Sequence, residues 1–201
     1  MTVTTKTILD PTIAARYKKP MNSERIDRFQ AIELLKKYSP DKDSLDHVLT
    51  HSERVSNYLL VLTSQLTSID KKFLETAALL HDIGRFVYPP KSPKAICHGL
   101  AGGEILRQEW LLQHARVAEC HIGIGISQQD IIKQNLPLPV RDFVPNTPEE
   151  MLITYADNLE VHGIKDEPFV EDRFAQELGP EYLARVKDFH RRIHNLLGHS
   201  V

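Results

Sequence analysis

The segment LLHDIGR (79–85) ends an apolar helical run with an imidazole directly beside a carboxylate, those of His81 and Asp82. Burying two polar groups at the edge of a core costs free energy unless a partner binds them. His and Asp side chains are both ligands of transition metals. The pair therefore predicts a metal ion, provided that other segments supply further ligands.

Further His and Asp residues stand where helical periodicity places them toward the core. His51 lies three residues after one valine and four before another, and Asp157 follows an isoleucine by four. His98 and His121 open HGLAGGEIL and HIGIGI, whose small residues let backbone approach closely. Each alone is explained as a satisfied core residue, but five such sites on separate helical elements predict a binding site.

The elements that must position these residues are helical. Apolar residues recur at spacings of three and four along most of the chain, with no alternating strand pattern and no internal repeat. We predict an all-α fold with a flexible tail over 1–20 and one domain over 21–201. The predicted helices span 22–38, 43–66, 71–84, 97–112, 114–122, 127–135, 148–162, 167–178 and 180–197, with N-caps at Asn22 or Ser23, Asp43 or Ser44, Asp70 and Thr147, and with Gly84 in the left-handed position that ends the third.

The composition is that of an ordinary globular protein: 41% of residues are hydrophobic, 26% are charged and the formal charge is −2. This balance argues against general nucleic-acid binding. We find no signal peptide and no apolar run long enough to span a bilayer, so we expect a cytoplasmic protein without a membrane partner. Cys97 and Cys120 are too few for a disulfide scaffold, and we interpret them as small core residues.

The order of these sites resembles the HD superfamily of metal-dependent phosphohydrolases, and most closely its HDIG branch. HVLTHSERV is similar to the helix of the first histidine, LLHDIGR to the central pair and YADNLE to the helix of the last aspartate. ICHGLAGGEIL and VAECHIGIGI are similar to the two additional histidine segments. The resemblance covers residues 43–162.

The resemblance implies a compact helical bundle and a ligand set. His51, His81, Asp82 and Asp157 would hold one metal, and in two-metal members Asp82 bridges to a second held by His98 and His121. Such ligands suit Fe, Mn, Zn, Co or Ni, one or two ions per chain. A metal-bound hydroxide would then hydrolyse a phosphate ester or anhydride, with Asp82 at the centre of the catalysis.

The resemblance further implies a small phosphorylated substrate, with a nucleotide as first choice, because the short layout is similar to that of bacterial dinucleoside-tetraphosphate hydrolases of the superfamily. A homodimer is an open alternative. Arg85 is expected to bind substrate phosphate or to form a salt bridge at the helix end. Two other functions stay open: an HD-type di-iron oxygenase, and a non-catalytic ligand-sensing module that metal stabilises.

Other residues are less informative. The prediction places Lys91 and Lys94 in a solvated loop, His47 near the surface, His162 at a helix end, and His190 and His194 on a solvated helix, while nothing places His114. Phe86, Tyr88 and Phe143 are proposed as walls of the substrate pocket.

Overall fold

The computed structural model describes residues 25–198. The tail predicted over 1–20 and the cap predicted at Asn22 or Ser23 lie outside these residues. The first described helix begins later than predicted, because Asp27 caps it and accepts a hydrogen bond from the Gln30 backbone N–H.

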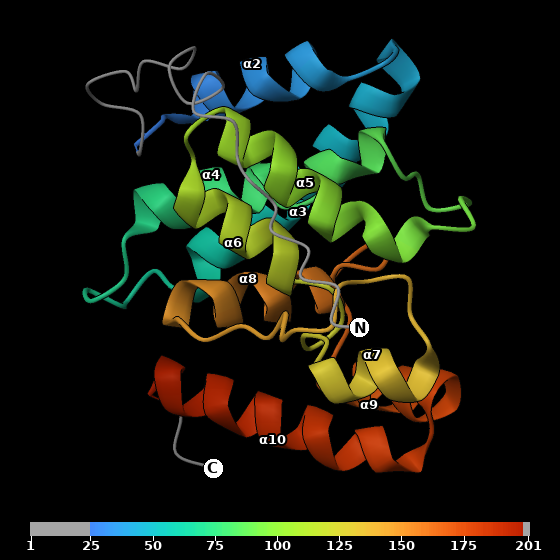
Figure 1. The fold of residues 1–201 in the computed structure, drawn as a ribbon. Helices are drawn as coiled ribbons and strands as arrows, with labels where there is room; N and C mark the ends of the chain where they lie inside the picture. Colours follow the sequence, from blue (N-terminus) through green and yellow to red (C-terminus); the bar gives the residue numbers. More distant parts are fainter. Residues whose placement is uncertain (1–24, 199–201) are drawn as a thin grey trace, which may run out of the picture.

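The described chain is all-α, as predicted (Figure 1). Its only strand-like contacts between residues 25 and 198 are two isolated bridges, Ile126 with Phe143 and Glu160 with Ile164. The elements in order are α2 (Arg28–Tyr38), α3 (Lys42–Leu62), α4 (Lys71–Leu80), the 3-10 helices η1 (Ile83–Phe86) and η2 (Ala95–Cys97), α5 (His98–Gln108), α6 (Leu112–Cys120), α7 (Gln128–Gln134), α8 (Pro148–Leu159), α9 (Glu167–Leu178) and α10 (Pro180–Leu197).

Side-chain caps set several helix starts. The caps predicted at Asp70 and Thr147 are confirmed, and Thr147 forms a capping box with Glu150. The start of α3 was predicted wrongly, because Asp41 is its N-cap and accepts from the Ser44 backbone N–H. This helix also ends at Leu62, before the predicted boundary at 66.

Gly84 does not end α4 in a left-handed conformation, so that prediction is wrong. The α-helix stops at Leu80, and Gly84 lies inside η1 without a positive φ. Its role is close packing, since a Cβ here would lie 2.5 Å from the backbone nitrogen of Gly102 and nearer still to the carbonyl oxygen of His98. The missing side chain therefore lets η1 rest directly on α5.

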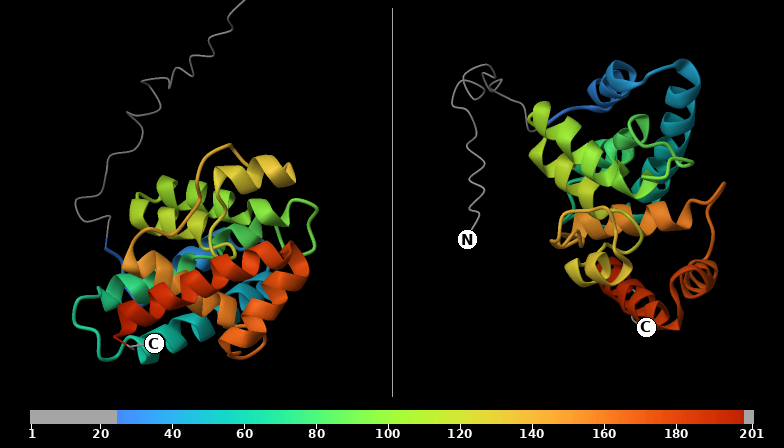
Figure 2. Two further views of the ribbon diagram at one scale, coloured as in Figure 1. Left: turned by 90° about the horizontal axis from the view of Figure 1, so that it is seen from below. Right: turned by 45° about the vertical axis from the view of Figure 1, so that its right-hand side comes forward.

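The helices enclose two clusters of buried apolar side chains, here the upper and the lower core (Figure 1). In this view α2 to α6 lie above α8, and α9 and α10 lie below it as a hairpin, side by side in Figure 2. The upper core consists of Ala31, Leu35, Val48, Leu79, Leu80, Ile83, Ile105, Leu106, Leu111, Ala115 and Ala118. The lower core consists of Val55, Leu59, Leu74, Ala77, Ala78, Val117, Ile124, Met151, Leu152, Ile153, Tyr155, Ala156, Leu159, Val170, Phe174, Val186, Phe189 and Ile193.

Three helices, α3, α4 and α6, contribute to both cores. On α3, Val48 belongs to the upper core and Val55 to the lower core, and His51 lies between these two residues. The polar residues predicted to bind metal are therefore at the boundary of two apolar clusters.

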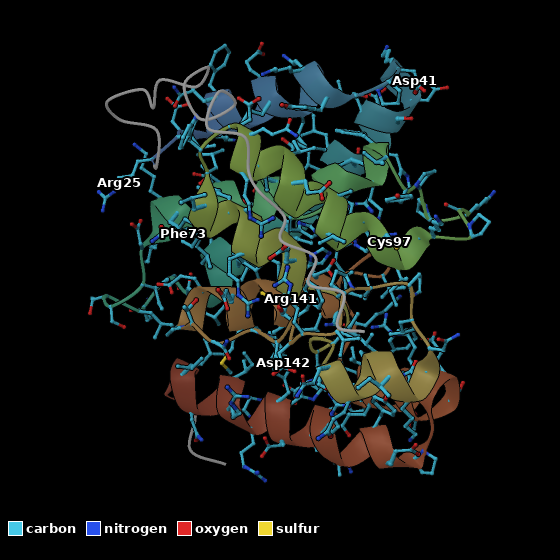
Figure 3. The ribbon with its side chains drawn as sticks, viewed as in Figure 1. Arg25, Asp41, Phe73, Cys97, Arg141 and Asp142 are labelled. Carbon is cyan, nitrogen blue, oxygen red and sulfur yellow. The ribbon has the colours of Figure 1, made fainter. Side chains whose placement is uncertain are left out.

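Both cysteines are buried and free. Cys97, labelled in Figure 3 beside the N-terminus of α5, donates from Sγ to the carbonyl of Pro137. None of the helices in the described part combines the length and the apolar character that crossing a membrane requires.

Candidate metal centre

Six elements bring the six predicted ligands together. His51 projects from the middle of α3, and Asp157 from the last turn of α8. His81 directly follows α4 and Asp82 precedes η1, while His98 begins α5 and His121 directly follows α6. All except His51 and Asp157 are less than a tenth exposed.

Asp82 lies between two groups of imidazoles. Its Oδ1 is 3.1 Å from Nε2 of His98 and 3.4 Å from Nε2 of His121. Its Oδ2 is 3.9 Å from Nε2 of His51 and 4.0 Å from Nε2 of His81. Each oxygen of one carboxylate therefore faces its own pair of nitrogens.

Asp157 completes the group around His51 and His81. Its Oδ1 lies 2.9 Å from Nε2 of His51 and 3.3 Å from Nε2 of His81. These three residues offer ligand atoms close enough to share one ion, and so do His81, Asp82 and His121.

The other ring nitrogen of each imidazole is held by an acceptor. Nδ1 of His81, His98 and His121 lies 2.6, 2.7 and 2.9 Å from the carbonyl oxygen three residues earlier in the chain. Nδ1 of His51 lies 2.6 Å from a carboxylate oxygen of Glu160. A carbonyl or carboxylate oxygen can only accept, so Nδ1 of each ring carries a proton, and whenever the ring is neutral its Nε2 lone pair points into the centre.

Whether these residues fit a metal ion depends on whether the Nε2 lone pairs have hydrogen-bond donors of their own, and within residues 25–198 they have none. Nε2 of His81 is fully buried and has no hydrogen-bond partner among the described residues. Nε2 of His98 and His121 face each other at 3.0 Å, and neither can donate while Nδ1 carries the proton. A divalent transition ion accepts such lone pairs, so the donor set fits one.

The electrostatics also favour a cation. With no cation bound, burial acts to raise the pKa of Asp82, but hydrogen bonds from the His121 and His98 rings, which require a proton on Nε2, outweigh it and hold the pKa well below its ordinary range. Asp157 is held low in the same way by His51 and His81. Burial acts to lower the pKa of His51, yet the contact with Asp157 dominates and raises it to about 9. A cation that binds His51 must therefore displace a proton.

The centre opens into a cavity of about 790 Å³ with several cationic side chains. Arg85 lies on its wall and donates from Nε to Oδ1 of Asp82 at 3.1 Å. The described residues that line the cavity are Asp46, His47, Thr50, His51, Arg54, Asp82, Arg85, Pro90, Lys91, Asp157, Asn158, Glu160, Val161, His162 and Arg173.

The sequence profile of the HD domain matches residues 48–161, which contain all six predicted ligands. The chain belongs to the HD domain family. An uncharacterized protein of Methanocaldococcus jannaschii is 32% identical over 84% of this chain and 97% of its own length. The HD domain of the phosphodiesterase PgpH of L. monocytogenes has 16% identity and a TM-score of 0.48, over 84% of this chain and 97% of that domain.

Two longer relatives are named tRNA (cytidine(56)-2'-O)-methyltransferase. The protein of Picrophilus torridus is 29% identical over 90% of this chain, and that of Thermoplasma volcanium is 35% identical over 66%. This chain spans about half of the first, 52%, and about a third of the second, 36%. Their names describe whole proteins that extend well beyond the matched part.

Sequence reasoning missed Glu160 and Arg173. Glu160 is 6% exposed and bonds to His51, and Arg173 lines the cavity from α9. Glu160 is the C-cap residue of α8, three residues after Asp157, and this spacing was the available signal.

The aromatic residues predicted as pocket walls are not among the described residues that line this cavity. Phe143 is buried under the guanidinium of Arg141, which is labelled in Figure 3 on the connector before α8, with Cζ 4.1 Å from the ring centroid. Phe143 was predicted as a wall of the substrate pocket, but residues of the segment 157–162 and Arg173 of α9 line the cavity instead.

Three histidines that were not predicted as metal ligands lie in different environments. His114 is buried away from the centre, with Nε2 2.9 Å from the Thr76 hydroxyl. His190 is 4% exposed and its Nδ1 lies 3.2 Å from Glu171, so the prediction of a solvated helix is wrong for this residue. His47 is exposed at the wall of the cavity.

Proposed function

We propose that this protein is a metal-dependent phosphohydrolase that hydrolyses a phosphate ester or anhydride of a nucleotide or another small phosphorylated molecule. The observation that carries the proposal is the position of Asp82, with one oxygen toward each of two pairs of converging imidazoles, at a cavity whose lining includes Arg85 and three further cationic side chains. Membership of the HD domain family supports it.

In this proposal His51, His81 and Asp157 hold one divalent ion, His98 and His121 hold a second, and Asp82 serves both. Bound ions supply a water of lowered pKa and polarise a phosphoryl oxygen. The chain's own contribution is orientation, because an acceptor at each Nδ1 holds the proton there and fixes the direction of every ring before a ligand arrives.

The cationic side chains of the cavity would bind the substrate's phosphate oxygens. Arg85 is the nearest, and it contacts Asp82 through Nε, which leaves the two terminal amino groups of its guanidinium for a phosphate. Arg54, Lys91 and Arg173 add positive charge further from the centre. A substrate with more than one phosphate could use them together.

We also propose that residues 21–201 act as one HD domain. The described part supports this, because α2 packs on the upper core and the hairpin of α9 and α10 packs on the lower core of the matched region. Nothing in the match to the longer relatives leads us to propose methyl transfer for this chain.

Elemental analysis of protein purified without chelator, together with phosphate release from a panel of nucleotides and sugar phosphates, tests the function. We expect close to two metals per chain and release from at least one substrate. Absence of metal after reconstitution with Fe, Mn, Zn, Co and Ni would refute the proposal. Two irons with oxygen consumption and no phosphate release would favour the oxygenase.

A further inference from the structure

A second cavity of about 300 Å³ lies beside the metal centre. Two of its lining residues, Ile122 and Asn158, directly follow the predicted ligands His121 and Asp157 in the chain, and a third, Ile96, precedes His98 by two. The cavity is therefore next to both halves of the centre. It is lined by Ile96, Ile122, Gly123, Ile124, Gly125, Ile126, Asp130, Gln134, Leu136, Asn158, Arg173, Phe174, Glu177, Leu178 and Tyr182.

The second cavity shares a wall with the cavity of the metal centre. Asn158 and Arg173 line both. Arg173 donates from Nη2 to Oδ1 of Asn158 at 2.9 Å, and Asn158 donates from Nδ2 to the carbonyl oxygens of Gly123 and Thr154. This network holds the guanidinium between the two cavities, where it can contact a ligand that occupies both.

The walls combine apolar surface with a few polar groups. Isoleucines, leucines and the rings of Phe174 and Tyr182 supply the apolar part. The Tyr182 hydroxyl donates to Asp130 at 2.8 Å and accepts from the Gln134 amide at 2.6 Å, which leaves the Gln134 carbonyl oxygen for a ligand. Glu177 adds a carboxylate to the lining.

This chemistry distinguishes between ligand classes. A nucleobase has apolar faces and an edge of hydrogen-bonding groups, whereas an acyl chain would leave the amide and carboxylate groups unmatched and a bare sugar would leave the isoleucines unmatched. The volume is at the lower end of small-molecule sites, about 300–1,000 Å³, and suits a single ring system.

We propose that this cavity binds the base of a nucleotide whose phosphate lies at the metal centre, with Arg173 contacting the nucleotide between the two. The inference rests on the proposed phosphohydrolase function and assigns its substrate to the nucleotides. The residues that line this cavity, and not the six predicted metal ligands, would then determine which substrate the protein selects.

The test uses two readouts, nucleoside binding and substrate kinetics, on the purified metal-loaded protein. Leu178→Trp narrows the cavity from the end of α9, where Leu178 is 38% exposed and tolerates a larger ring. Gln176→Trp, exposed on the same helix and outside the lining, is the matched control. Leu136→Trp, in the segment after α7, is a second obstruction if the first variant does not fold.

By equilibrium dialysis we expect at least one of adenosine, guanosine, cytidine and uridine to bind. We expect Leu178→Trp to raise the Kd of that nucleoside about tenfold or more. The same variant should raise KM for the corresponding nucleoside monophosphate without lowering release from ribose 5-phosphate, which has no base. The control should change neither value. Failure of all four nucleosides to bind at millimolar concentration, or equal effects of both variants, would overturn the inference.

The two proposals fail separately. Nucleoside binding that Leu178→Trp weakens, with no phosphate release from any nucleotide or sugar phosphate, would uphold the base site and refute the hydrolase. Phosphate release that is equally fast from substrates with and without a nucleobase, and that Leu178→Trp does not change, would uphold the hydrolase and refute the base site.

Discussion

Glu160 offers the sharpest test of the centre, because it is outside the predicted ligand set and contacts one of those ligands, His51. Its Oε2 lies 2.6 Å from Nδ1 of His51, and its Oε1 accepts from the Gly163 backbone N–H at 2.9 Å. In Glu160→Gln the amide has a single oxygen, so it can accept from His51 or from Gly163 but not from both. Glu160→Ala removes both acceptors.

The expected loss follows from this geometry. Removing the partner of a metal-bound imidazole costs about 10- to 100-fold in metal affinity, or about 1.4–2.7 kcal/mol. Glu160→Gln should fall near the lower value, because one hydrogen bond can survive without the negative charge. Glu160→Ala should fall near the higher value, because Nδ1 of His51 then loses its protein acceptor.

Competition with a chromophoric chelator measures the metal Kd, and circular dichroism checks the fold. Glu149→Gln, in the first turn of the same helix and outside the cavity lining, is the control and should keep the wild-type Kd. Wild-type Kd values for both Glu160 variants would refute the claim that this carboxylate fixes the tautomer of His51.

Asp82→Ala should abolish metal binding and phosphate release, whereas His121→Ala should lose one metal of two; elemental analysis checks both, and full metal content in Asp82→Ala would contradict the ligand assignment. Gly84→Ala would place a Cβ against the carbonyl oxygen of His98, so urea unfolding should show a loss of at least about 1–3 kcal/mol; an unchanged midpoint would contradict the close packing of η1 on α5. Burial lowers the pKa of His114 from 6.5 to about 4, so the unfolded chain binds more protons in this interval and stability should fall by up to about 3 kcal/mol as the pH drops through it. His114→Gln should flatten that part of the stability profile, and an equally steep profile would assign the acid loss to other groups.

Local signals in the sequence were sufficient for most helices and insufficient where several signals competed. The ranges predicted for α9 and α10 are confirmed, and Thr147 with Glu150 marks the start of α8 without ambiguity. Before α3 there are three possible caps within four residues, Asp41, Asp43 and Ser44, and the extended backbone at Asp41 decides among them. A pattern of residue types does not contain that backbone angle.

The six predicted ligands could be named because the order of their motifs resembles a family, but their supporting residues could not. A glutamate at the end of a helix is usually solvated, so Glu160 carries a signal only once the end of α8 beside Asp157 is known to be buried. The prediction for His190 was wrong for the same reason. Its basic neighbours in the sequence indicated a solvated helix, whereas its acidic partner Glu171 comes from another helix, α9. Which helices pair is a property of the assembled fold.

The structure also explains why an apolar helix ends on a histidine. His81, His98 and His121 share one position, directly after the last residue of α4, η2 and α6. The last carbonyl groups of an α-helix have no intrahelical donor, and the rings of His81 and His121 give their Nδ1 protons to such carbonyls three residues back. The ring of His98 donates to the carbonyl of Ala95, which also accepts the His98 backbone N–H. At His81 and His121 one hydrogen bond thus satisfies the helix end and turns the Nε2 lone pair toward Asp82. Substituting these histidines with asparagine, which can cap a helix end but offers no second ring nitrogen, should therefore cost more metal affinity than stability.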